Sequence, residues 1–153
     1  MTDDYMVRRA RPSDYDAIIA VVDEWWGRQI SGALPRLFLD HFFTTSAVVE
    51  SSGAMVAFLV AFLSPSRPDE AYIHFVGVHP DHRHAGLARS LYEAFFAYAA
   101  ESGRSRVTAV TSAANTGSIA FHERMGFRVS TPIDGYNRRG IAHVVFERAL
   151  APR

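Results

Sequence analysis

Residues 76–91 read Val76-Gly77-Val78-His79-Pro80-Asp81-His82-Arg83-His84-Ala85-Gly86-Leu87-Ala88-Arg89-Ser90-Leu91, which predicts a strand, a turn and the start of a helix. Small residues gather where this helix begins, at Ala85, Gly86 and Ala88. The first N–H groups of a helix have no intrahelical partner, and the helix dipole favours negative charge beside them. Small side chains would let a diphosphate approach these groups. The segment therefore predicts an anion site, and a plain strand-to-helix turn is the alternative.

The composition excludes several chemistries at such a site. Neither Gly-x-x-x-x-Gly-Lys nor Gly-x-Gly-x-x-Gly is present, which argues against nucleoside triphosphate and dinucleotide sites. All sixteen basic residues are arginine, so a Schiff-base lysine is excluded. The chain has no cysteine, so disulfides, thiolate metal sites and thiol-linked intermediates are excluded as well.

Length and charge predict one soluble domain over residues 1–153. The chain is 48% hydrophobic and 21% charged, with a formal net charge of zero and no basic run, so we expect no nucleic-acid partner. The acidic start, Met1–Asp4, does not resemble a targeting signal, and the longest apolar run, residues 54–63, is too short to cross a bilayer. We therefore expect a cytoplasmic protein with no membrane partner, and these features leave a homodimer open.

Apolar spacing predicts a central sheet covered by helices. Ser13 is the expected N-cap of a first helix, and Trp25 completes its buried stripe. Helices are expected to begin near Leu37, Gly86 and Thr116 as well. The expected strands are 6–10, 47–50, 55–63, 72–78, 106–111, 127–133 and 141–150.

At this point the sequence resembles the GNAT superfamily of N-acetyltransferases, whose pyrophosphate loop runs Arg/Gln-x-x-Gly-x-Gly/Ala. The matching stretches are Arg83-His84-Ala85-Gly86-Leu87-Ala88, Asn115-x-x-Ser118-Ile119-x-x-His122-x-x-x-Gly126-Phe127, the opening Arg8–Asp14, and Val78-His79-Pro80. The resemblance implies an α/β (α+β) fold, with a mixed, mostly antiparallel sheet of six to seven strands and about four helices. It also implies acetyl-CoA as co-substrate.

The same resemblance assigns the residues that would bind this co-substrate. Backbone amides of residues 84–89 would hold the diphosphate, and the carrier arm would follow the preceding strand. The implied set is Val76, Gly77, Val78, Arg83, His84, Ala85, Gly86, Leu87, Ala88, Arg89, Asn115 and Ser118. A glycine inside a strand often marks close approach of a ligand, which fits Gly77, and simple packing is the alternative.

The second motif predicts one polar face on a short helix, because Asn115, Ser118, Ile119 and His122 follow helical spacing. Asn115 could serve only as the helix cap. His122 stands where many family members have a tyrosine that protonates the departing thiolate. An imidazole could donate that proton, and the alternative is a contact or surface role.

An amine nucleophile must lose a proton before it attacks, so some group should accept it. Relatives often use a glutamate on the strand before the loop, and this strand has none inside it. His74 is the expected substitute, because strand alternation puts Tyr72, His74 and Val76 on one face. Glu70 at the strand entrance is a weaker candidate, and a structural histidine is the alternative.

Acceptor recognition is expected from aromatic side chains at Trp26, Tyr72 and Tyr136, while Arg138 and Arg139 could hold a carboxylate. Core packing or simple solvent exposure is the alternative for each. The histidines of residues 79–84 lack metal-ligand spacing, so we expect no metal. The resulting expectation is transfer of acetyl from acetyl-CoA to a primary amine of a small molecule by direct attack. Acetylation of a protein or peptide N-terminus and a non-catalytic acyl-CoA-binding module are the alternatives.

Overall fold

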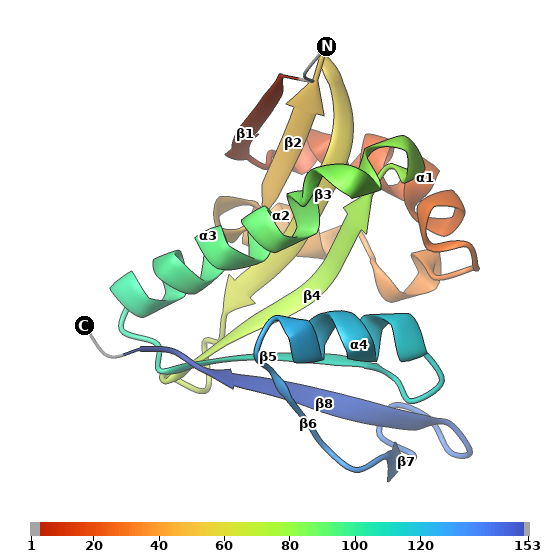
Figure 1. Ribbon diagram of the computed structural model, residues 1–153, viewed down its shortest axis with the longest axis vertical. Helices are drawn as coiled ribbons and strands as arrows, with labels where there is room; N and C mark the ends of the chain where they lie inside the picture. The colour runs from red at the N-terminus through yellow and green to blue at the C-terminus, as the bar shows by residue number, and fades with distance from the viewer. Residues whose placement is uncertain (1–3, 152–153) are drawn as a thin grey trace. The chain divides into compact units, whose positions relative to one another are not determined.

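The computed structural model describes residues 4–151, which contain eight strands and four α-helices (Figure 1). Met1–Asp3, part of the segment examined for a targeting signal, lies outside the described residues. The strands are β1 (Tyr5–Arg9), β2 (Ala47–Ser51), β3 (Ala54–Leu63), β4 (Glu70–Val78), β5 (Arg106–Ser112), β6 (Arg128–Val129), β7 (Ile133–Asp134) and β8 (Ala142–Ala149). The α-helices are α1 (Tyr15–Trp26), α2 (Leu37–Phe42), α3 (Leu87–Glu101) and α4 (Thr116–Arg124).

These strands hydrogen-bond in the order β1-β2-β3-β4-β5-β8-β6, and β7 pairs with β8. Pairing is parallel between β4 and β5 and antiparallel for β1–β2, β2–β3 and every partner of β8. The predicted class, a mixed and mostly antiparallel sheet with helices, is confirmed. The sheet has eight strands instead of the expected six to seven.

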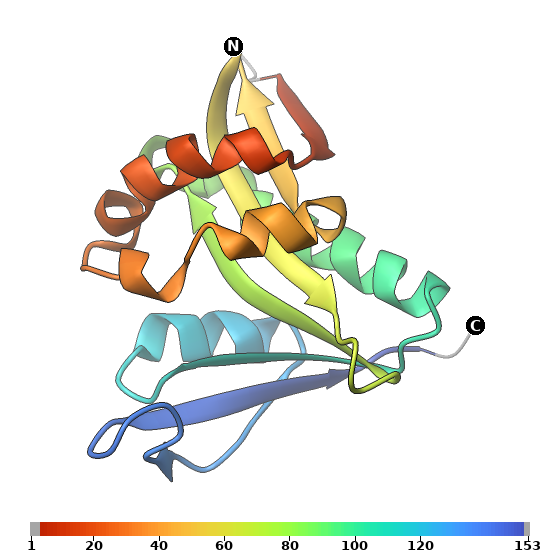
Figure 2. The ribbon, with the colours of Figure 1, turned by 180° about the vertical axis from the view of Figure 1, so that it is seen from behind.

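The chain forms two compact units, one of residues 4–62 and 73–95 and the other of residues 63–72 and 96–151. In the first unit, helices α1 and α2 cross one face of the strands, as Figure 2 shows, and the beginning of α3 lies over the opposite face. The core between the strands and α1 and α2 contains Ile18, Val22, Trp25, Leu39, Val48, Phe58, Val60 and Phe75. This core positions the end of β4.

The second unit packs α4 on the antiparallel pair of β5 and β8 (Figure 1). Its central contact is the ring of His122, which stacks on Phe146 at a centroid distance of 3.9 Å and an interplanar angle of 2°. Phe127 meets the same imidazole edge-on at 5.1 Å. His122 is only 5% exposed, and burial lowers its pKa to about 4 although its hydrogen bond to Ser118 opposes the shift.

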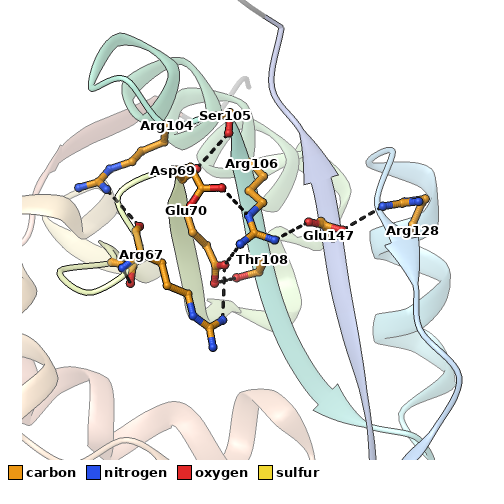
Figure 3. A network of polar contacts seen from close by, with 10 residues as sticks. Arg67, Asp69, Glu70, Arg104, Ser105, Arg106, Thr108, Arg128 and Glu147 are labelled. Atoms are coloured by element: carbon orange, nitrogen blue, oxygen red, sulfur yellow. Dashed lines mark hydrogen bonds and ion pairs between the residues drawn. The ribbon is translucent and has the colours of Figure 1, made fainter.

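A polar network fixes the strands of the second unit where β4 meets β5 (Figure 3). The carboxylate of buried Glu70 accepts a hydrogen bond from the Thr108 hydroxyl at 2.7 Å and pairs with the Arg106 guanidinium at 2.9 Å. Arg106 also reaches Glu147 on β8 at 2.8 Å. One guanidinium therefore links three neighbouring strands, and the Glu70 carboxylate has a structural role in this network.

Two expected boundaries are wrong. Ser13 does not cap α1, because a 3-10 turn at Pro12–Asp14 precedes it and the Asp14 carboxylate accepts the Arg11 N–H at 2.7 Å. Residues 127–133 do not form one strand. The Ser130 hydroxyl accepts the Val145 N–H at 2.9 Å in place of a ladder bond, and Pro132 has no N–H to donate, so β6 and β7 are separate.

Gly77 lies on β4 directly against the core. A Cβ at this position would meet Phe58 Cε1 at 2.5 Å and Cζ at 2.6 Å, and the Phe58 ring is fully buried. The structure therefore gives Gly77 a packing reason, which was the alternative to close approach of a ligand. None of the helices within residues 4–151 has the length and apolarity needed to cross a membrane.

Replacement of Gly77 by alanine should lower the free energy of unfolding by about 1–3 kcal/mol, because the new methyl group forces the Phe58 ring to move. Denaturant unfolding followed by circular dichroism measures this change. Gly32→Ala is the matched control, since nothing lies within 4 Å of a Cβ at Gly32. Equal unfolding midpoints for Gly77→Ala and the wild type would show that this contact does not constrain the core.

Acid should destabilise the second unit through His122. Its pKa is about 4 in the folded chain and near 6.5 in a free imidazole, so below pH 6.5 the unfolded state binds the proton first. The expected loss is roughly 3 kcal/mol between pH 7 and pH 4. His122→Leu should remove this part of the pH dependence, and His41→Leu, at an exposed position of α2, should keep it because His122 is unchanged. If the free energy of unfolding falls equally with pH in wild type and His122→Leu, His122 does not cause the acid destabilisation.

Candidate functional site

The turn from β4 into α3 has the geometry that the sequence predicts for an anion site. A 3-10 helix, Pro80–Ala85, ends at Gly86, which has a left-handed backbone with φ 72°. The first hydrogen bond of α3 runs from the Ser90 N–H to the Gly86 carbonyl at 3.1 Å. The N–H groups of Leu87, Ala88 and Arg89 therefore lie at the amino end of the helix, ahead of its hydrogen-bond ladder.

The surroundings of this helix end suit an anion. No heavy atom lies within 4 Å of the point where a Gly86 side chain would begin, so the backbone is open to approach. The first turn of α3 contains no acidic residue, while His82, Arg83 and His84 immediately precede it. Ala85 and Ala88 are half-buried, and His84 and Arg89 are exposed. These residues fit a diphosphate by main-chain donors and by charge.

Hydrogen bonds from side chains of the turn to neighbouring parts of the protein stabilise its shape. The Arg83 guanidinium donates to the Val78 carbonyl at 3.3 Å and to the Trp25 carbonyl, so this side chain anchors the turn. His79 Nδ1 accepts the Asp81 N–H at 3.0 Å and caps the 3-10 helix. His82 Nδ1 meets the Tyr5 hydroxyl at 2.9 Å. These bonds give Arg83 a structural role in the turn, and its expected contribution to binding stays a prediction.

Strand β4 alternates as predicted, with Tyr72, His74, Val76 and Val78 half-buried between buried neighbours. The Val76 carbonyl accepts a hydrogen bond from Trp26 Nε1 at 3.0 Å. The Trp26 ring also packs on Phe75 at a centroid distance of 4.9 Å. Trp26 is thus fixed to the strand, and its expected role in acceptor recognition stays a prediction.

His74 is the half-buried imidazole of this strand. Its Nε2 donates to the Ala33 carbonyl at 2.7 Å, because a carbonyl oxygen can only accept. The ring stacks on Phe38 of α2 at 4.0 Å with an interplanar angle of 7°. Burial lowers the pKa of His74, and the hydrogen bond to Ala33 opposes this shift. The side chain is therefore an oriented, neutral imidazole near pH 7.

Sequence reasoning missed both groups that orient His74. Ala33 and Phe38 lie about forty residues before it and carry no motif, so only the folded chain brings them to β4. The same is true of Tyr5, which reaches the 3-10 turn through His82. No sequence pattern could have identified these three neighbours.

The predicted residues of the second motif lie in the second unit. The Asn115 side chain accepts the Ser118 N–H at 3.2 Å and donates to Thr111 Oγ1 at 3.2 Å, so Asn115 is the N-cap of α4. His122 Nδ1 donates to the Ser118 carbonyl at 2.8 Å, and its ring is inside the core. The expected polar face of this helix is thus largely occupied by internal hydrogen bonds. A buried, neutral imidazole favours the structural role of His122 over that of a proton donor.

Tyr72 and Tyr136 also belong to the second unit. Burial, together with the electrostatic influence of Tyr136 and Glu70, raises the pKa of Tyr72 to about 12. Tyr136 is exposed near the tip of the β7–β8 hairpin, and its ring lies 6.0 Å from that of His143. The Tyr72 phenol therefore stays protonated near neutral pH.

Across the part of the chain that the structure describes, no three histidine, cysteine, aspartate or glutamate side chains form a cluster that could hold a metal ion. His79, Asp81 and His82 belong to the interactions of the turn instead.

A curated relative, N-acetyltransferase family 8 member 3 of Rattus norvegicus, is 28% identical over 99 residues. That match covers 62% of this chain and 43% of the relative, so the chain spans less than half of that protein.

Solved structures share the fold at lower identity. Ard1 from Thermoplasma volcanium superposes with a TM-score of 0.80 at 19% identity, over 96% of this chain and 98% of that one. Diaminobutyrate acetyltransferase EctA from Paenibacillus lautus, in complex with L-2,4-diaminobutyric acid and coenzyme A, gives 0.70 at 20% identity over 95% of both chains. The ribosomal-protein-S18-alanine N-acetyltransferase from Escherichia coli gives 0.71 at 18% identity, over 98% and 96%.

The family pattern described as acetyltransferase (GNAT) family matches residues 13–127. This range holds the open helix end at Gly86, the histidine of β4 and the capped helix α4. The chain therefore belongs to the acetyltransferase (GNAT) family.

Proposed function

We propose that this chain is an acetyl-CoA-dependent N-acetyltransferase that acts on a primary amine of a small molecule. The observation that carries the proposal is the open amino end of α3 behind Gly86, within a chain of this family. Main-chain N–H groups of residues 84–89 would hold the diphosphate, and the carrier arm of coenzyme A would lie along strand β4. When bound, acetyl-CoA supplies an acetyl group already activated as a thioester.

The chain's own contribution is to accept a proton. In the net reaction one C–N bond forms and one C–S bond breaks. The attacking ammonium loses one proton before attack, and the proton that the nitrogen loses after attack goes to the departing thiolate of coenzyme A. His74 takes that proton as a neutral imidazole, held by Ala33 and Phe38. Main-chain N–H groups of β4 stabilise the negative charge on the carbonyl oxygen. Since the chain has no cysteine, the acetyl group passes directly to the amine.

The acceptor is proposed as a small amine on the likeness to EctA, whose structure contains L-2,4-diaminobutyric acid. The alternative is a protein N-terminus, supported by the likeness to the ribosomal-protein-S18-alanine enzyme. A non-catalytic acyl-CoA-binding module is the third function, supported by the pairing of Glu70, the glutamate of β4, with Arg106 and by the buried His122.

Release of coenzyme A thiol separates these three functions. Amines and short peptides with free N-termini are each incubated with acetyl-CoA, and the released thiol is measured with a chromogenic disulfide. The absence of cysteine removes any protein background from this assay. We expect turnover with small amines. Turnover with peptides alone would favour the second function, and binding of acetyl-CoA without turnover on any amine would favour the third.

Gly86→Asp should weaken the binding of coenzyme A about ten-fold or more relative to Gly86→Asn. Both side chains are similar in size, and asparagine and aspartate tolerate the left-handed backbone at φ 72° better than other residues do, so the pair differs mainly by one negative charge beside the phosphates. Isothermal titration calorimetry gives the two dissociation constants, and thermal unfolding checks that both variants fold. Equal affinities would place the diphosphate elsewhere.

His74→Gln should lower kcat by roughly 10²-fold with little change in the affinity for acetyl-CoA. Glutamine can still donate to the Ala33 carbonyl but cannot take the proton. Because the pKa of His74 is lowered, the acid limb of kcat/KM in the wild type should lie below pH 6.5. A variant with wild-type kcat, or with the same acid limb, would remove His74 from the mechanism.

A further inference from the structure

Strand β1 is the outermost strand of the first unit, and no described strand or helix lies beyond it in either view (Figures 1 and 2). Two adjacent side chains on it are exposed, Met6 at 68% and Val7 at 57%. They are the two most exposed large hydrophobic residues of residues 4–151. An apolar edge strand is a template for pairing, and proteins normally guard such an edge with charge or cover it.

Alternate residues of this strand point their backbone N–H and carbonyl groups away from β2. The Ala10 N–H donates to the Ser46 carbonyl at 3.0 Å, so Ala10 is turned toward β2. In an antiparallel ladder alternate residues face the same neighbour, so Arg8 and Met6 also turn toward their partners on β2. Val7 and Arg9 therefore turn their N–H and carbonyl groups to the outer edge.

Of the two arginines on the strand, Arg8 is folded back, and Arg9 is exposed at the end of the strand. The Arg8 guanidinium pairs with Asp14 at 2.8 Å and with Glu50 of β2. Its charge is thus neutralised by carboxylates of its own unit, which leaves Met6 and Val7 as the groups presented at the middle of the strand.

We propose that β1 pairs antiparallel with β1 of a second copy of this chain, about a two-fold axis at Val7. A residue on a two-fold axis perpendicular to the sheet pairs with its own copy, so its backbone N–H and carbonyl groups must point to the outer edge, as those of Val7 do. Val7 is the middle residue of Tyr5–Arg9, so pairing there uses the whole strand. Val7 then faces the partner's Val7, and Arg9 faces the partner's Tyr5.

Charge favours a second copy as the occupant. Asp4 is exposed before the strand, and Arg9 and Arg11 are exposed at and after its end. Antiparallel pairing brings the acidic beginning of one copy to the basic end of the other. The register at Val7 also keeps Arg8 opposite the partner's Met6, so no two guanidinium groups face each other. A five-residue strand buries little area, so the dimer should be weak and concentration-dependent.

Sedimentation velocity over a range of protein concentrations tests this pairing. Wild type should shift from 17.0 kDa toward twice that mass, while Val7→Lys should remain a monomer because two ammonium groups meet at the axis. Leu37→Lys is the control, since Leu37 is 50% exposed on α2 and should leave the dimer intact. A monomeric wild type, or a Val7→Lys variant that dimerises like wild type, would overturn the proposal.

Cross-linking tests the register even where Val7→Lys does not fold. The chain has no cysteine, so Val7→Cys, Met6→Cys and Leu37→Cys each carry a single thiol. With dissolved oxygen and a copper(II) catalyst as oxidant, Val7→Cys should form a disulfide-linked dimer several-fold faster than the other two. Only residues opposite each other come within disulfide reach, and in this register Met6 faces Arg8. Equal rates for Val7→Cys and Leu37→Cys would refute pairing of β1, and faster Met6→Cys would refute the register.

Discussion

The left-handed backbone at Gly86 is the constraint on which the candidate site depends. At this residue the chain changes from a 3-10 turn to α3, and a φ of 72° is a conformation that side chains disfavour. The change of direction leaves the first amides of α3 ahead of the hydrogen-bond ladder. Arg83, His79 and His82 then hold the turn from the protein side. The same geometry that ends one helix and begins the next thus produces the helix end at which we propose that the diphosphate binds.

The histidines of this chain lie in different environments and therefore differ in their properties. His74 is half-buried, stacked on Phe38 and held by the Ala33 carbonyl, which suits a base that must stay neutral. His122 is stacked between core aromatic rings, where burial lowers its pKa to about 4. His82 contacts a tyrosine hydroxyl and braces a turn. Side-chain identity alone does not distinguish a base from a packing group.

Charged side chains join the strands of the second unit. Glu70 is buried at the start of β4, where it pairs with the Arg106 guanidinium and accepts a hydrogen bond from the Thr108 hydroxyl. Removing one partner of such a buried group leaves an unpaired charge, which costs more than the pair contributes. The network in Figure 3 therefore aligns β4, β5 and β8 and offers no free base.

The sequence by itself determined the fold class, most element positions and the open helix end at Gly86. These features are local, since apolar periodicity, glycine and proline positions, and a short motif act within a few residues of one another. It also indicated the alternation of β4 that places His74. It did not indicate that Gly77 packs on Phe58, that Trp26 bonds to the Val76 carbonyl, or that residues 127–133 divide into two strands.

Those features were decided only by the tertiary structure. Each depends on a partner distant in the sequence: nineteen residues separate Gly77 from Phe58, and fifty separate Trp26 from Val76. The role of His122 was decided in the same way, because the ring that buries it belongs to β8. Periodicity shows which side of an element is apolar, but which group a polar side chain meets there depends on how distant segments pack.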